Sequence, residues 1–179
     1  MNMRRRVAVA ATAAVAASTL LAAPAEAATR TFTDPKGDVA HPMDIEWVKV
    51  HNARRLVVTL KHRNITAGEQ RGGSSGVYID VDRGNGNRPT YLIAGGVGTD
   101  YSFFIMRDWT RSLSTPKCRY RETLDYDRNL TRFSISRGCL NGASFEATEV
   151  RVSAIANVSS RRNDWTPGFH RWSPWIPRD

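Results

Sequence analysis

From residue 29 onward, apolar side chains alternate with polar ones over short stretches, and clusters of glycine, asparagine, aspartate and proline separate these stretches. Leu56, Val58 and Leu60, for example, occupy every second position of one stretch. Successive side chains of a β-strand point to opposite faces, so a period of two gives each strand one apolar face. A helical period of 3.6 residues is hard to find in the same region. The pattern therefore predicts an all-β fold.

The pattern indicates nine strands, near residues 29–33, 44–51, 54–62, 76–82, 90–94, 101–107, 118–126, 131–137 and 149–158. Most of the segments between them are short and rich in turn formers. About nine strands in about 150 residues are typical of an antiparallel β-sandwich, which we expect to be jelly-roll-like. A closed barrel is the alternative. Within residues 44–51 the apolar phase changes between Trp47 and Val48, which predicts a β-bulge or a strand buried on both faces.

The first 27 residues have the layout of a secretory signal peptide. Three arginines, Arg4 to Arg6, precede an alanine-rich apolar run, and Ala25-Glu26-Ala27 matches a small-x-small cleavage signal. We expect residues 1–27 to be removed and residues 28–179 to form one secreted, extracellular domain. No apolar run long enough to cross a bilayer follows the signal, so we expect no membrane span.

The chain has a net charge of +9, and removal of the signal leaves about +7. This charge favours a polyanionic partner, and we expect a cell-wall glycan or another anionic envelope polymer. The basic residues are scattered along the sequence, and the longest clusters after the signal are pairs such as Arg54-Arg55. Nucleic-acid binders concentrate charge on one face beside stacking aromatics, so we do not expect a nucleic-acid partner. We expect a monomer.

Both cysteines, Cys118 and Cys139, lie in the exported part, where disulfides persist. If residues 127–130 form a hairpin loop, Cys118 faces Cys139 and Glu122 faces Ile135 across two antiparallel strands. Facing Cα atoms lie roughly 4.5 to 5.5 Å apart, within reach of a disulfide. We therefore predict a Cys118–Cys139 bridge that contributes about 3 kcal/mol to stability.

Two loops carry acidic residues. Asp34, Asp38 and Asp44 lie between the first two predicted strands, and Ca²⁺ takes six to eight oxygen ligands from such groups. We consider these three residues candidate ligands of a structural Ca²⁺; ordinary turn chemistry is the alternative. The second loop, residues 80–87, places Arg83 among its acidic residues and lacks the closing glutamate of an EF-hand, so we expect a hairpin turn there.

Aromatic residues fall outside the clearest strands. They are Trp109 and three residues of the last fifteen, Trp165, Trp172 and Trp175. Exposed rings can stack on sugars, which makes Trp109, Trp172 and Trp175 candidate ligand-binding residues. The alternative is that they anchor the proline-containing C-terminal segment onto the sandwich.

No metalloprotease motif and no nucleophile elbow is present in the sequence. Acid–base catalysis would need two proton-transfer groups close in space, which His51 or His62 with Glu46 could supply. We therefore predict a non-catalytic extracellular module that binds a glycan or envelope component with structural calcium. The alternatives are a small secreted nuclease-like hydrolase and a purely structural or protein-interaction domain.

The layout resembles a group of small secreted actinobacterial proteins without an assigned activity. The matching pieces are residues 31–38, 44–50, 55–62, 78–80, 98–101, 136–140 and 169–175. The Asp-x-x-Gly-Asp opening of residues 34–38, followed by Asp44-Ile, also resembles DOMON-like β-sandwiches, including some carbohydrate-binding modules. This second resemblance implies a structural calcium near the first turn, held by Asp34, Asp38 and Asp44.

Overall fold

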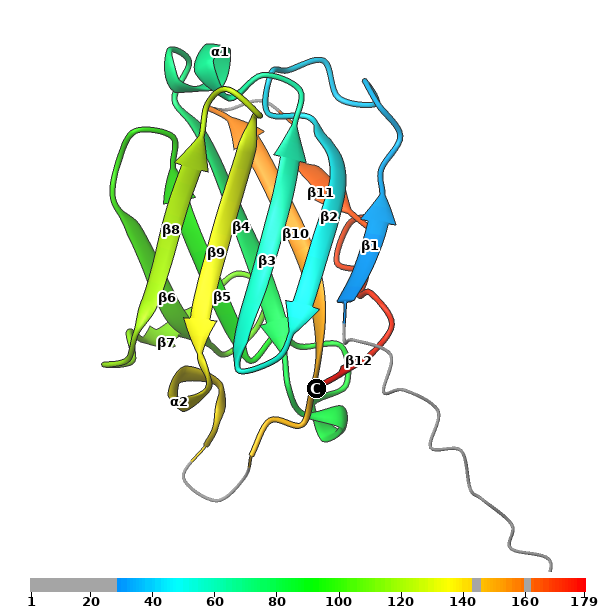
Figure 1. Cartoon of the computed structure of the whole chain (residues 1–179), viewed down its shortest axis with the longest axis vertical. Coiled ribbons are helices and arrows are strands. Elements are labelled where there is room, and N and C mark those ends of the chain that lie inside the picture. Colours follow the sequence, from blue (N-terminus) through cyan, green and yellow to red (C-terminus); the bar gives the residue numbers. More distant parts are fainter. Residues whose placement is uncertain (1–28, 143–145, 160–161) are drawn as a thin grey trace, which may run out of the picture.

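The computed structural model describes residues 29–142, 146–159 and 162–179, so the predicted signal peptide lies outside the described residues. Two antiparallel sheets pack face to face (Figure 1). The front sheet has the order β1 (Thr29–Thr33), β2 (Ile45–Asn52), β3 (Arg55–His62), β9 (Leu130–Ser136) and β8 (Tyr120–Asp125). The back sheet has the order β11 (Asp164–Thr166), β10 (Glu149–Val158), β4 (Gly73–Asp80), β5 (Tyr91–Gly96), β6 (Tyr101–Met106) and β7 (Ser112–Ser114), with β12 (Ile176–Pro177) also paired to β10.

Short helices connect some of the strands: α1 (Ile65–Glu69), α2 (Arg137–Leu140) and the 3₁₀ helix η1 (Arg83–Asn85). In the part of the chain that the structure describes, no helix is long and apolar enough to cross a membrane.

The predicted antiparallel β-sandwich is confirmed, and the two separate sheets argue against the closed barrel. All nine predicted strands are present, with bounds that differ by at most three residues. The structure adds β7, β11 and β12, which have only two or three residues each and therefore show no alternation in the sequence. The register shift between Ile45 and Trp47 confirms a β-bulge in β2.

The core lies between the sheets and consists of the apolar half of each alternation. Val58 and Phe133 of the front sheet and Val77 and Phe103 of the back sheet are fully buried. Burial of such side chains is the main favourable contribution to folding. The other half of each alternation faces outward, so each sheet has an outer face with its own chemistry.

The β8–β9 hairpin differs from its predicted register by two residues. Glu122 pairs with Phe133 rather than Ile135, and the loop comprises residues 126–129 rather than 127–130. Asn129 adopts a positive φ of 54°, a conformation that asparagine tolerates better than most residues. Its side-chain oxygen also accepts a hydrogen bond from the Ile65 backbone N–H at 2.9 Å. The loop position is thus tied to a residue far away in the sequence.

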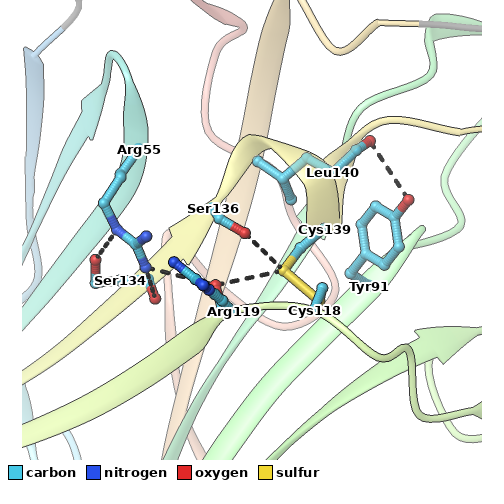
Figure 2. The surroundings of a disulfide bond; sticks show 8 residues. All are labelled: Arg55, Tyr91, Cys118, Arg119, Ser134, Ser136, Cys139 and Leu140. Carbon is cyan, nitrogen blue, oxygen red and sulfur yellow. Dashed lines mark hydrogen bonds between the residues drawn. A yellow bond between two sulfur atoms is a disulfide. The ribbon is translucent and has the colours of Figure 1, made fainter.

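The Cys118–Cys139 disulfide is nevertheless present, with a Cα–Cα distance of 5.4 Å (Figure 2). Cys139 lies in α2 rather than in β9, and this helical turn brings its sulfur back to Cys118. The Tyr91 hydroxyl of the back sheet donates to the Leu140 carbonyl at 3.4 Å. The bridge closes the open end of the β8–β9 hairpin, and this hydrogen bond joins that end to the back sheet.

Candidate cation site

Three carboxylates from distant parts of the chain converge at one edge of the sandwich. The strands β1, β2 and β11 lie close together at this edge (Figure 1). Asp34 follows β1, Asp38 lies in the next turn, and Asp164 begins β11. One oxygen of each residue lies within 4.8 Å of the others. Asp34 and Asp38 were predicted ligands, whereas Asp164 was not.

Backbone hydrogen bonds hold this arrangement in place. Asp164 is 1% exposed, and its Oδ2 accepts a hydrogen bond from the Ile45 N–H at 2.5 Å, which joins β11 to β2. Asp44 lies outside the group of three, and its Oδ2 accepts from the Gly37 N–H at 2.8 Å. Gly37 has a φ of +79°, which glycine adopts without steric cost. Asp44 therefore shapes the loop that presents Asp34 and Asp38.

Burial, together with the neighbouring negative charges, raises the pKa of two of these carboxyls, Asp34 and Asp164. Burial raises the pKa of Asp164 to about 7. The hydrogen bond from the Ile45 N–H opposes this rise, and the negative charges of Asp34, Asp38 and Asp44 contribute to it. Burial, with smaller contributions from Asp38 and Asp44, also raises the pKa of Asp34 to about 6, although Thr166 opposes this shift. Like charges at this separation disfavour ionisation unless a cation compensates them.

The structure provides no compensating side chain within residues 29–142, 146–159 and 162–179: none of the three carboxylates forms an ion pair there. Asp34 Oδ2 is buried without a hydrogen-bond partner, and so is Asp44 Oδ1. Unpartnered buried carboxylate oxygens are costly, and a hard divalent cation would satisfy them. The donor set consists of oxygen atoms alone, which suits Ca²⁺ or Mg²⁺ better than a transition metal.

The acidic group opens into a cavity of about 330 Å³. Asp38 and Asp164 form part of its lining, and the aromatic residues Trp165 and Phe169 form another part. Phe169 is 69% exposed, an unusual position for a large apolar ring, and Arg162 also contributes to the lining. We name this hollow the acidic–aromatic cavity. Phe169 was not among the predicted ligand-binding residues because a lone phenylalanine in a proline-containing segment carries no distinguishing pattern.

The predicted ligand-binding tryptophans lie beside the cavity, in an aromatic cluster. Trp109 packs against Tyr78, Trp165, His170 and Trp172, with ring centroids 4.5–6.0 Å apart. The guanidinium of Arg151 lies over Trp172 at 4.9 Å and over Trp175 at 4.8 Å.

These contacts are those expected of residues that anchor the C-terminal segment, the alternative interpretation. Ligand binding by Trp109, Trp172 and Trp175 therefore remains a prediction.

An ion pair and hydrogen bonds hold the second acidic loop, residues 80–87, in place. Asp80 Oδ2 pairs with Arg151 at 2.6 Å, and its Oδ1 accepts from the Thr90 hydroxyl at 2.9 Å. Asp82 accepts from the Gly84 N–H at 2.8 Å and caps η1. These carboxylates already have partners, in contrast to those of the cation site.

The structure does not assemble the predicted acid–base pair. His62 is fully buried, its two ring nitrogens contact the Met43 carbonyl and the Thr131 hydroxyl, and burial lowers its pKa to about 4. His51 and Glu46 lie five positions apart on β2, which separates their Cα atoms by about 16 Å. Neither histidine is placed to share a substrate with Glu46.

No protein-family model and no curated protein matches this chain.

Proposed function

We propose that the protein is an extracellular, non-catalytic module that binds a glycan at a Ca²⁺ site formed by Asp34, Asp38 and Asp164. The observation that carries this proposal is the convergence of the three carboxylates, two of which, Asp38 and Asp164, line a cavity that also contains an exposed aromatic ring. Ca²⁺ accepts six to eight oxygens, so three carboxylates leave coordination positions for backbone carbonyls, water or sugar hydroxyls.

The aromatic part of the cavity supplies the second element of recognition. Phe169 exposes most of its ring, and Trp165 lies edge-on to it with ring centroids 5.5 Å apart. Sugar rings present C–H groups that pack on aromatic faces. In this arrangement the ion binds the polar edge of the sugar and Phe169 packs against its apolar face. Arg162 and Asn163, which also line the cavity, are available for further hydrogen bonds.

Thermal unfolding in excess CaCl₂ and in EDTA tests the cation site. A ligand present at about 100 times its Kd stabilises the folded state by about 2.7 kcal/mol, so Tm should rise by about 5 °C or more in CaCl₂. Asp38→Asn and Asp164→Asn should abolish this rise, whereas Asp127→Asn, an exposed loop variant, should retain it. MgCl₂ should give a smaller rise. An unchanged Tm of the wild-type protein in CaCl₂ would contradict the cation site.

Retention on insoluble cell-wall polysaccharide tests the glycan part. The wild-type protein should be retained in CaCl₂ and released by EDTA. Phe169→Ala should lose retention but keep the Ca²⁺-dependent rise in Tm, because the ring does not belong to the ligand set. Equal retention of Phe169→Ala and wild type, or retention that survives EDTA, would contradict glycan binding at this cavity.

A further inference from the structure

The outer face of the front sheet gathers positive charge that is dispersed in the sequence. Alternation places every second residue of β2, β3, β9 and β8 on this face, because the intervening residues, such as Val58 and Phe133, are buried. Its basic residues, which we name the cationic face, are Lys49, Arg55, Lys61, Arg121 and Arg132. Their positions in the sequence span more than seventy residues, and strand pairing alone brings them together.

Acidic side chains do not neutralise this face. Asp125 of β8 is the acidic residue in these outward positions, and it already pairs with Arg128 at 2.6 Å. Glu46, at the bulge of β2, pairs with Lys36 at 3.3 Å. Throughout the described ranges, no residue of the cationic face takes part in an ion pair. Arg55 and Lys61 are oriented by neutral groups, the Ser134 hydroxyl at 2.7 Å and the Arg128 carbonyl at 2.7 Å (Figure 2 for Arg55).

A hollow of about 310 Å³ lies in the middle of the cationic face. Val57 and Thr59 of β3 contribute to it, and Lys49 and Arg132 flank Thr59 on the two neighbouring strands. Two strand spacings separate the Cα atoms of Lys49 and Arg132 by about 10 Å, so both long side chains can reach one anionic group above Thr59. His51 also lines the hollow, where its Nδ1 lies 2.8 Å from the Thr29 hydroxyl.

The chemistry of the face favours one kind of partner. Arginine binds phosphate oxygens in a bidentate manner, and threonine and serine hydroxyls between the cations can bind further oxygens. Bases of single-stranded nucleic acid would need aromatic platforms. On the outward positions of these four strands Trp47 alone supplies a Trp, Tyr or Phe ring, and the large aromatic cluster lies on the back sheet. We propose that the cationic face binds a linear polyol phosphate, a phosphodiester polymer without bases, with one phosphate held between Lys49 and Arg132.

Fluorescence anisotropy with a labelled synthetic oligo(glycerol phosphate) tests this proposal, with EDTA present so that the cation site does not contribute. Lys49→Gln/Arg132→Gln should weaken binding about tenfold and reduce the dependence of log Kd on log salt between about 50 and 200 mM NaCl. Arg88→Gln/Arg107→Gln removes the same charge from exposed positions outside the cationic face and should change Kd by less than about threefold. Circular dichroism establishes that both variants are folded.

Three results would overturn the proposal. The first is an absence of binding to the oligomer by the wild-type protein. The second is an equal loss of affinity in both double variants, which would indicate that net charge alone acts. The third is binding of oligothymidylate with the same number of phosphates as tightly as the glycerol phosphate oligomer, which would indicate a nucleic-acid partner. Each result is independent of the Ca²⁺ site, because the measurements are made in chelator.

Discussion

The outer faces of the two sheets differ in the side chains that they carry and in what covers them. On the front sheet, the outward positions carry separated cations with neutral hydroxyl groups between them, and none of these cations has an ion-pair partner among the described residues. On the back sheet, Tyr78 and Trp165 stack at 5.6 Å, and Trp109 and the segment 168–172 fold over them. In our proposal the charged groups of the front face bind a partner from outside the molecule, whereas the rings of the back face pack against loops of the same chain.

Hydrogen bonds also tie loops to the outer face of the back sheet. The Tyr78 hydroxyl donates to the Trp109 carbonyl at 2.9 Å, and Trp109 Nε1 donates to the Asn87 carbonyl at 2.7 Å. These bonds connect β4, the β6–β7 loop and the loop after η1. Aromatic residues of the back face therefore hold loops against the sheet, whereas the cations of the front face form no ion pair among the described residues.

The largest expected effect on stability follows from removal of the Trp109 ring, which lies at the centre of the aromatic cluster on the back sheet. Trp109→Ala should lower the free energy of unfolding by about 3 kcal/mol, because four ring contacts and one hydrogen bond are lost. Trp47→Ala, on the front sheet, is the matched control and should cost less than half as much. Urea unfolding measures both values. A smaller loss for Trp109→Ala than for Trp47→Ala would remove the distinction between the faces.

A smaller, pH-dependent effect on the free energy of unfolding is expected for Glu122, which lies between the two sheets. Glu122 is 9% exposed, its Oε1 has no hydrogen-bond partner, and burial raises its pKa to about 7. Because the folded-state pKa exceeds the unfolded value, the stability that this group contributes is present below about pH 4.5 and is lost as the pH rises through about 7. Glu122→Gln should therefore be more stable than wild type at pH 8, by about 1 kcal/mol or more, and the difference should shrink at pH 5.

Thermal unfolding of the two proteins at both pH values tests this prediction. The pKa values of Asp34 and Asp164 are also raised, so without a bound cation these two carboxyls also lower the stability as the pH rises. The difference between variant and wild type removes this shared contribution. A stability difference that is the same at pH 5 and pH 8 would show that Glu122 does not titrate in this range.

The smallest expected effect on stability concerns the cationic face of the front sheet. Lys49→Gln/Arg132→Gln should leave the free energy of unfolding within about 0.5 kcal/mol of wild type, since exposed side chains without ion pairs contribute little to folding. Urea unfolding again gives the value. A loss above about 1 kcal/mol would mean that these residues stabilise the sheet, and the contrast with the outer face of the back sheet would weaken.

The β8–β9 hairpin shows how far sequence patterns reach. A shift of two residues keeps every side chain on its own face, so the apolar and polar faces were predicted correctly although the register was not. The disulfide prediction also survived this shift, because α2 turns the chain after β9 and moves Cys139 within reach of Cys118. The positive φ of Asn129 and its hydrogen bond to Ile65, which fix the actual loop, depend on contacts that the hairpin sequence does not contain.

Alternation and turn chemistry are local properties, and by themselves they determined the all-β fold, most strand positions and the buried half of each strand. Which strands become neighbours is a non-local property, and only the tertiary structure decided it. That pairing brings Asp164 to Asp34 across 130 positions, and it aligns Lys49 with Arg132 on either side of Thr59. Both candidate binding sites consist of residues from distant segments, whose proximity is set by the packing of the whole sandwich.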